Sequence, residues 1–155
     1  QSDDGPALFE AIIAQGGEGI MAKRREGLYR PGKRHSDWLK VKGVQEESFL
    51  VVGLTKGTGW RESLFGAVVL AKYADLRGTL VDVGEAGTGF DNRSLQAVLA
   101  ATHPLRQSRP PAGIAPRKDI LTWLQPKLLA DIKFHAKTED ERLRFPVFMR
   151  LRLDR

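Results

Sequence analysis

The feature that most constrains the fold is a series of short β-type runs, separated by turn residues and interrupted by one helical segment. The stretches Lys56–Gly59 and Asp75–Gly78 have the composition of turns. Asp91 or Asn92 caps the helical segment, and Pro104 stops it. The expected strands are 48–54, 64–73 and 79–84 before the helix, and 132–137 and 147–153 after it, with 120–124 as an additional candidate.

Three strands, a helix and two strands form the order of a five-stranded Greek-key barrel of the oligonucleotide/oligosaccharide-binding (OB) type. Such barrels commonly bind nucleic acid or oligosaccharide. Other small barrels and α+β folds share this order, so the order alone leaves them open. Residues 1–43 differ, because a helix over 6–15 is followed there by two strands, over 18–23 and 37–42, and by a basic loop between them. We therefore expect a mainly β fold with α, divided into residues 1–43 and a barrel domain over 44–155.

Composition excludes several classes of protein. The 155 residues include 25 Lys and Arg, 19 Asp and Glu and no Cys, which excludes disulfide scaffolds, cysteine nucleophiles and Cys-based zinc sites. No apolar run is long enough to span a membrane. Basic clusters flank a neutral middle and favour phosphate-bearing partners, although an ordinary solvated surface has the same charge. Because the chain begins with Gln1, we expect a fragment or a processed product.

The segment Trp38–Lys42 places two lysines on one face of a strand. Residues i and i+2 share a face, so Leu39 and Val41 are expected to face a core while Lys40 and Lys42 face the other way. Two ammonium groups about 6–7 Å apart repel each other unless an anion such as phosphate lies between them. A solvated edge strand protected by lysines is the alternative interpretation.

The segment Glu18–Lys23 carries a charged residue at each end of a short apolar strand. Buried charges are costly unless they are paired or used. Glu18 is a candidate ligand for a divalent metal, and Lys23 is a candidate ligand for phosphate. Strict alternation places the two on opposite faces, so a shared site needs a bulge or a strand end. Alternatively, both lie at solvated strand ends.

The last expected strand carries two arginines. A planar guanidinium donates two hydrogen bonds at once to phosphate oxygens, and Asp154 is a candidate either to orient Arg152 or to lie near a metal-bound phosphate. A salt-bridged surface strand is the alternative. Alternation predicts one face with Val147, Met149, Leu151 and Leu153, and another with Phe148, Arg150, Arg152 and Asp154. Elsewhere, Trp60 and Phe90 adjoin glycines, and we expect them to pack rather than to stack on bases.

Taken in order, these segments resemble the C-terminal half of an ATP-dependent DNA ligase. The fourth, fifth and sixth nucleotidyltransferase motifs of that family are similar to Glu18–Lys23, Asp37–Lys42 and Arg144–Arg155. The ligase module of bacterial end-joining ligases, often called ligase D, is similar to Tyr29–Gly32, Val83–Phe90 and Trp123–Pro126. The resemblance implies that residues 1–43 are the remnant of an α/β nucleotidyltransferase (adenylation) domain and that residues 44–155 are its OB-fold domain.

The resemblance also implies an activity. Such ligases use ATP and Mg²⁺ or Mn²⁺ to seal nicks in double-stranded DNA through lysyl-AMP and DNA-adenylate intermediates. The resemblance implies that Glu18 binds a metal and that Lys40 and Lys42 contact the AMP phosphate, with Lys23 as a further cofactor-binding candidate. It implies that Arg152 and Asp154 serve the first step, steering the leaving pyrophosphate when the OB domain closes. The implied setting is the bacterial cytoplasm, at the nucleoid, with end-joining repair proteins as partners and no membrane.

The sequence departs from the family pattern at three points. Arg150 stands where bacterial relatives often have a small residue, and Leu153 where an acidic one is common. No lysine is followed by Asp at +2 and Gly at +3, so the nucleophile motif Lys-x-Asp-Gly is expected upstream of Gln1 and the chain alone is expected to be inactive. Two alternatives remain open: a stand-alone OB module that binds nucleic acid without catalysis, and a fragment of an RNA ligase or capping guanylyltransferase. The text of Gly84–Phe90 and Trp123–Pro126 favours a DNA ligase.

Overall fold

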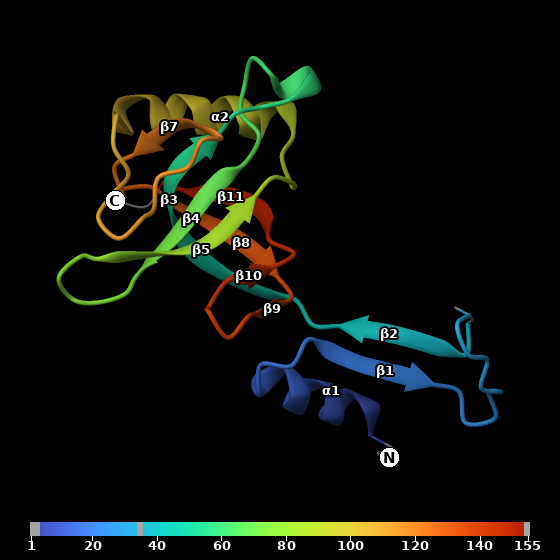
Figure 1. Ribbon diagram of the computed structural model, residues 1–155. Helices are drawn as coiled ribbons and strands as arrows, with labels where there is room; N and C mark the ends of the chain where they lie inside the picture. The colour runs from blue at the N-terminus through green and yellow to red at the C-terminus, as the bar shows by residue number, and fades with distance from the viewer. Residues whose placement is uncertain (1–3, 34–35, 154–155) are drawn as a thin grey trace.

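The computed structural model describes residues 4–33 and 36–153. A β-barrel capped by a helix forms the larger part, and a small helix–hairpin unit projects from the opposite end of the barrel (Figure 1). The hairpin unit, as we call residues 4–42 without the undescribed residues 34 and 35, contains α1 (Gly5–Ala14), β1 (Gly19–Lys23) and β2 (Trp38–Lys42). No helix among the described residues is both long enough and apolar enough to cross a membrane.

Five antiparallel strands build the barrel in the order β11-β8-β3-β4-β5. β11 closes the barrel, because the amide of Phe148 donates a hydrogen bond of 2.9 Å to the carbonyl of Thr88, just after β5. The strands are β3 (Gln45–Thr55), β4 (Val68–Tyr73), β5 (Leu80–Ala86), β8 (Leu129–Phe134) and β11 (Val147–Arg152), with α2 (Asn92–Thr102) between β5 and β8. This connectivity confirms the predicted mainly β fold with an OB-type Greek-key barrel.

Short elements complete the barrel. The expected extra strand over 120–124 is present as β7 (Ile120–Leu124), which pairs with the end of β3. The segment 103–118 contains η2 (His103–Leu105) and β6 (Arg106–Gln107), and β6 pairs with β7. The remaining elements are η1 (Gly59–Arg61) and the hairpin of β9 (Ala136–Lys137) and β10 (Leu143–Arg144).

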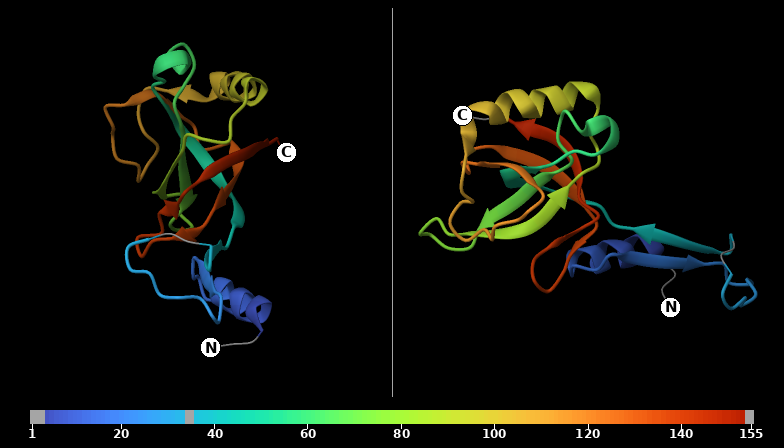
Figure 2. Two further views of the ribbon diagram at one scale, coloured as in Figure 1. Left: turned by 90° about the vertical axis from the view of Figure 1, so that its right-hand side faces the viewer. Right: turned by 45° about the horizontal axis from the view of Figure 1, so that its top comes forward.

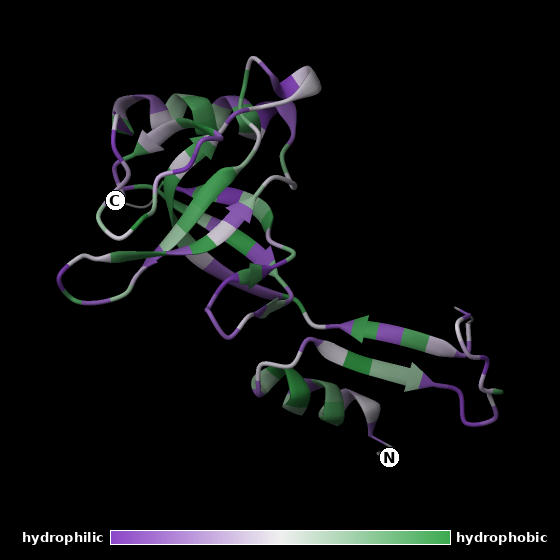
Figure 3. Ribbon diagram, viewed as in Figure 1, coloured by the Kyte–Doolittle hydropathy of each residue, from purple (hydrophilic) through white to green (hydrophobic). Residues whose placement is uncertain are grey.

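The core is apolar and aromatic, and β4 is hydrophobic along most of its length in Figure 3, whereas β5, β8 and β11 mix hydrophobic and hydrophilic residues. Phe90 stacks on Phe148 with 4.4 Å between ring centroids and meets Phe65 edge-on at 5.2 Å. Phe90 therefore packs, as expected. Trp60 does not pack, because 67% of its surface is exposed on η1, and that expectation was wrong. Gly89 (φ 91°) lies against the carbonyl of Phe148, and a Cβ there would collide with it, so close approach of β11 requires glycine.

β11 departs from the predicted alternation because it contains a bulge. Phe148 lies opposite Ile132 and Arg150 lies opposite Asp131, so Met149 is the extra residue. Phe148 is consequently buried in the core, and the prediction that it shares a face with the arginines was wrong. The bulge leaves both Arg150 and Arg152 exposed.

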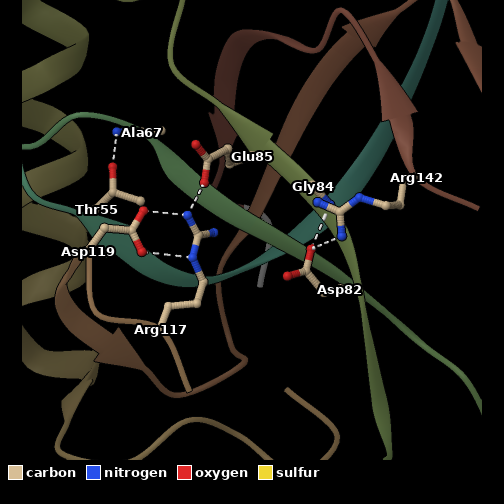
Figure 4. A network of polar contacts seen from close by, with 8 residues as sticks. All are labelled: Thr55, Ala67, Asp82, Gly84, Glu85, Arg117, Asp119 and Arg142. Carbon is tan, nitrogen blue, oxygen red and sulfur yellow. Dashed lines mark hydrogen bonds and ion pairs between the residues drawn. The ribbon is translucent and has the colours of Figure 1, made fainter. Parts of the chain in front are cut away.

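The loop before β7 is fixed to the barrel by a polar network, drawn in Figure 4. The guanidinium of Arg117 donates two hydrogen bonds to the carboxylate of Asp119, at 2.5 and 2.9 Å, and lies 2.6 Å from a carboxylate oxygen of Glu85 on β5. These contacts lower the pKa of Asp119 and raise that of Arg117. The network holds the loop against β5. Asp82, also on β5, accepts a hydrogen bond of 3.5 Å from Arg142 near by (Figure 4).

Candidate functional site

The hairpin of β1 and β2 gathers three lysines on one face. The antiparallel register places Lys23 opposite Trp38, Met21 opposite Lys40 and Gly19 opposite Lys42. Because directly opposed residues point to the same side, Lys23, Lys40 and Lys42 share one face, which we call the lysine face. The predicted placement of Lys40 and Lys42 on one face of β2 agrees with this register.

The three lysines differ in their contacts. The ammonium of Lys23 lies 4.4 Å from the ring centroid of Trp38, which in turn lies 5.6 Å from Tyr29. The ammonium of Lys42 lies 4.8 Å from the ring of Phe145, which follows β10. Within 4–33 and 36–153, no hydrogen bond or ion pair involves the ammonium of Lys40. No carboxylate of the β1–β2 strands opposes these charges, so the lysine face is suited to an anion.

The other face of the same hairpin is apolar. It carries Ile20, Ala22, Leu39 and Val41, and α1 packs near its end, where Ile13 lies against Gly43. Leu39 is nevertheless 60% exposed and Val41 39% exposed. The expectation that these two side chains face a core is therefore wrong for the described residues.

Glu18 lies at the start of β1 and is ion-paired with Arg144 of β10. Beside this pair, Nδ1 of His135 lies 2.6 Å from the carbonyl oxygen of Gly43, which can only accept, so the ring donates through Nδ1. Together with the contact of Lys42 with Phe145, these interactions join the barrel to the strand ends of the hairpin unit. Glu18 and Lys42 are thus brought to the same junction, although they leave the hairpin on opposite faces.

Arg152 lies in a different place. β11 runs away from the hairpin unit (Figure 2, right), and Arg152, its last residue, lies against the first half of β3 rather than against the lysine face. There, Arg152 donates a hydrogen bond of 3.1 Å to the hydroxyl of Ser48, and its Nε lies 3.7 Å from Asp131. The structure therefore does not bring Arg152 together with Lys40 and Lys42. Asp154 lies outside the described residues.

At the junction, Glu18 is the carboxylate that could bind a divalent metal. Within the described parts of the chain, no three Asp, Glu, His or Cys side chains gather in a way that could hold a metal ion. Mg²⁺ is often bound by one or two carboxylates together with substrate phosphates and water. Glu18 fits that donor chemistry, on condition that Arg144 releases it.

Sequence reasoning missed several residues that the structure makes important. In the segment of Arg144 and Phe145, only the later arginines were predicted as site residues. No local sequence pattern predicts that Arg144 contacts Glu18 or that Phe145 contacts Lys42. Asp131 lies one residue before the strand predicted over 132–137, because that strand begins at Leu129. A single acidic residue in an apolar strand is the signal that could have identified it.

Comparison with known families assigns both parts of the chain. Residues 61–155 match the model of the ATP dependent DNA ligase C terminal region, and residues 2–42 match that of the ATP dependent DNA ligase domain. The protein from Mycolicibacterium smegmatis called multifunctional non-homologous end joining protein LigD is 33% identical over 98% of this chain and 20% of its own length. A DNA ligase of Thermococcus fumicolans is 32% identical over 100% of this chain and 28% of its own length. The chain belongs to the ATP-dependent DNA ligase family.

Solved structures give the same result. The ligase domain of Mycobacterium tuberculosis LigD superposes with a TM-score of 0.67 at 29% identity, and this chain covers 50% of it. A mycobacterial DNA ligase D complexed with ATP and MES gives a TM-score of 0.60 at 28% identity, with 49% of it covered. The chain therefore spans about half of these ligase domains and about a fifth of the LigD relative from M. smegmatis.

Proposed function

We propose that this chain is the C-terminal part of an enzyme that seals nicks in duplex DNA with ATP, and that the lysine face contacts the phosphate of the bound adenylate. The lysine face is the observation that carries the proposal, because three cations share one side of a short hairpin without an opposing carboxylate on its strands. A phosphate placed there relieves the repulsion between Lys40 and Lys42. Residues 1–43 are proposed as the end of an adenylation domain, and residues 44–155 as its OB domain.

In the proposed reaction, a lysine that this chain lacks attacks the α-phosphate of ATP and pyrophosphate leaves. Positive groups placed where phosphoryl charge develops lower the barrier, which is the proposed role of Lys40 and Lys42, with Lys23 at the edge of the same face. Arg152 is proposed to serve this first step by contacting the leaving pyrophosphate, and Asp154 by orienting Arg152. Because Arg152 contacts Ser48 and Asp131 rather than the lysine face, its role requires the barrel to rotate relative to the hairpin unit.

Glu18 is proposed to hold Mg²⁺ or Mn²⁺, and such an ion supplies further neutralisation of phosphate charge when it is bound. In the present arrangement, Arg144 neutralises the Glu18 carboxylate. Rotation of the barrel would withdraw Arg144 and free that carboxylate. The proposed partners are nicked duplex DNA and end-joining proteins, because the LigD relative is named as a non-homologous end joining protein, and the proposed setting is the bacterial nucleoid.

The experiment requires a polypeptide that contains a nucleophile. We define the fusion protein as this chain joined behind the part of the M. tuberculosis ligase domain that precedes the matched region. The fusion protein is expected to seal a labelled nick in duplex DNA with ATP and Mg²⁺, and the chain alone is expected not to. A fusion protein that forms no lysyl-AMP, or a chain that seals nicks alone, would contradict the proposal.

Two alternative functions give different results in the same experiment. A fragment of an RNA ligase or capping enzyme predicts that nicked RNA is joined in preference to nicked DNA. A binding module without catalysis predicts that the fusion protein stays unadenylated while the chain still binds DNA. For the chain alone, we expect weak binding to duplex DNA that falls steeply with salt, since Lys and Arg contacts to phosphates dominate such binding. Affinity that is equal at low and high salt would contradict this expectation.

A further inference from the structure

Asp131 is a carboxylate of β8, the strand that lies between β3 and β11. Of the described carboxylates, Asp131 is the one that is buried, with 4% of its surface exposed. A buried carboxylate is costly unless it is hydrogen-bonded and paired with a cation. The register supplies partners from both neighbours, because Ser48 of β3 and Arg150 of β11 both lie directly opposite Asp131.

The two oxygens of Asp131 have different partners. Oδ2 lies 2.8 Å from Nη2 of Arg150, which also lies 2.8 Å from a carboxylate oxygen of Glu46. Oδ1 accepts a hydrogen bond of 2.5 Å from the hydroxyl of Ser48 and lies 3.7 Å from Nε of Arg152. Arg150 is therefore the close counterion of Asp131, and Arg152 the more distant one.

This cluster is unsuited to phosphate in the arrangement described. A cavity of about 210 Å³ is lined by Glu46, Glu47, Ser48, Asp131, Arg150 and Arg152. Glu47 is paired with Lys137, and Glu46 and Asp131 are left to Arg150 and Arg152, so both guanidinium groups already have carboxylate partners. If Arg152 is to contact pyrophosphate, it must exchange Asp131 for a phosphate oxygen. Without another cation, that exchange would leave a buried carboxylate unpaired, which costs far more than the pair contributes.

We propose that Arg150 and Asp131 are positioning residues for Arg152, with Arg150 as the counterion that stays on Asp131 and so allows Arg152 to leave for the nucleotide. This inference rests on the proposed function of Arg152. The bulge in β11 is part of the arrangement, because it places Arg150 opposite Asp131 and directs both arginines out of the core. Asp131 orients Arg152 in the arrangement described. When Arg152 leaves for a phosphate oxygen, Arg150 stays paired with Asp131 and so lowers the free-energy cost of that step.

The first arm of the test uses the intact chain and does not depend on catalysis. The rate of rotation about the Nε–Cζ bond of Arg152 is measured from its guanidinium ¹⁵N resonances. Arg150→Ala should slow this rotation, because Arg152 becomes the main cation near Asp131. The double variant Arg150→Ala/Asp131→Asn should restore it, and Arg109→Ala, an exposed arginine of the loop before β7, is the matched control. An unchanged rate in Arg150→Ala would overturn the proposal.

The second arm uses the fusion protein and separates the steps. Arg150→Ala should slow formation of lysyl-AMP about tenfold, since a charge-assisted hydrogen bond to Arg152 must then be broken. Sealing of a nick that already bears a 5′-adenylate should be unchanged, and Arg150→Ala/Asp131→Asn should recover the first step. A purely structural role for Arg150 would impair both steps, and the second substitution would not rescue them.

The outcomes distinguish this proposal from the proposed function. If Arg152→Ala slows lysyl-AMP formation but Arg150→Ala does not, Arg152 acts as proposed and the positioning role of Arg150 is wrong. If Arg152→Ala leaves lysyl-AMP formation unchanged, the role of Arg152 in the first step is wrong and the positioning role falls with it. Slower rotation of Arg152 together with a slower and rescued first step is the result that we expect.

Discussion

The barrel and the hairpin unit differ in how much of their apolar surface each buries within itself. The barrel part buries two apolar clusters, and the barrel closes through the hydrogen bond from Phe148 to Thr88. In the hairpin unit, none of the described residues is buried, although it contains a helix and two paired strands. A two-stranded hairpin is marginal without a surface to cover its apolar face. The barrel is thus a complete folding unit, whereas the hairpin unit presents two faces that need partners.

The two faces of the hairpin unit need different partners. The lysine face needs an anion, and the apolar face of Leu39 and Val41 needs other apolar groups. Because the chain covers 50% of the M. tuberculosis ligase domain, the remainder of an adenylation domain is the proposed cover for the apolar face. Stability therefore resides in the barrel, whereas the lysines proposed to bind phosphate lie in the part of the chain with the least burial.

The largest effect is expected in the core of the barrel. Phe65 is fully buried and contacts Phe90. Phe65→Ala should lower the free energy of unfolding by about 3–5 kcal/mol through lost burial and a residual cavity. Chemical denaturation followed by circular dichroism measures it, and Leu76→Ala, at an exposed position, is the control. Equal effects of the two substitutions would mean that the barrel does not carry the stability of the chain.

The next effect concerns catalysis rather than stability. Lys42→Ala in the fusion protein should slow lysyl-AMP formation about 100- to 1,000-fold, because a cation near developing phosphoryl charge is removed. The free energy of unfolding should change by less than about 1 kcal/mol, as expected for an exposed side chain with one aromatic contact. Lys33→Ala, in the loop before β2, is the matched control. If Lys42→Ala unfolds the protein instead, the assignment of Lys42 to a phosphate-binding face is wrong.

A smaller effect is expected at the network of Arg117, which fixes a loop to the barrel. Arg117→Ala should cost about 0.5–1 kcal/mol near neutral pH, the usual range for a partly exposed ion-pair network. Hydrogen bonds from Arg117 hold the pKa of Asp119 below its ordinary value of 3.8. That contribution is therefore present above pH 3.8 and is lost as the pH falls through the lowered value.

Thermal unfolding of wild type and Arg117→Ala between pH 7 and pH 2 measures this dependence. The two proteins should differ at pH 7 and converge at the acid end. A difference that grows as the pH falls would have the wrong sign and would contradict the network. Arg109→Ala, which lies in the same loop, should behave as wild type throughout.

The smallest effect in the chain alone is expected at Leu39. Leu39→Ala should change the free energy of unfolding by less than about 0.5 kcal/mol, since the side chain is mostly exposed. In the fusion protein, the same substitution should cost about 2 kcal/mol, because the added segment is proposed to bury it. Denaturation of both proteins measures the difference. A negligible cost in the fusion protein as well would show that nothing covers the apolar face.

Local rules predicted much of this fold. Turn residues and alternation located most of the strands, and the capping box of Asp91 and Ser94 marks the start of α2. The errors arose where tertiary contacts override alternation. The bulge at Met149 turns Phe148 into the core, and nothing in the neighbouring sequence predicts that extra residue. Arg61 donates hydrogen bonds to the carbonyls of Gly66 and Gly87, which fixes the segment before Val68 in a turn. The strand expected over 64–73 therefore begins only at Val68.

The site was predicted less completely than the fold. The spacing of Lys40 and Lys42 is local, so it could be interpreted from the sequence. The pairing of Glu18 with Arg144 and the sharing of Asp131 by two arginines join residues far apart in the chain, and only the register of the strands brings them together. Long-range partners of this kind require the structure.

The most direct test of the account is the formation of an acid-stable adduct from labelled ATP and Mg²⁺. We predict no adduct on the chain alone, an adduct on the fusion protein, and at least about a 100-fold slower adduct on the Lys40→Ala/Lys42→Ala fusion protein, with its fold intact. An adduct on the chain alone, or an undiminished rate in the double variant, would contradict the claim that the lysine face binds the phosphate of the nucleotide.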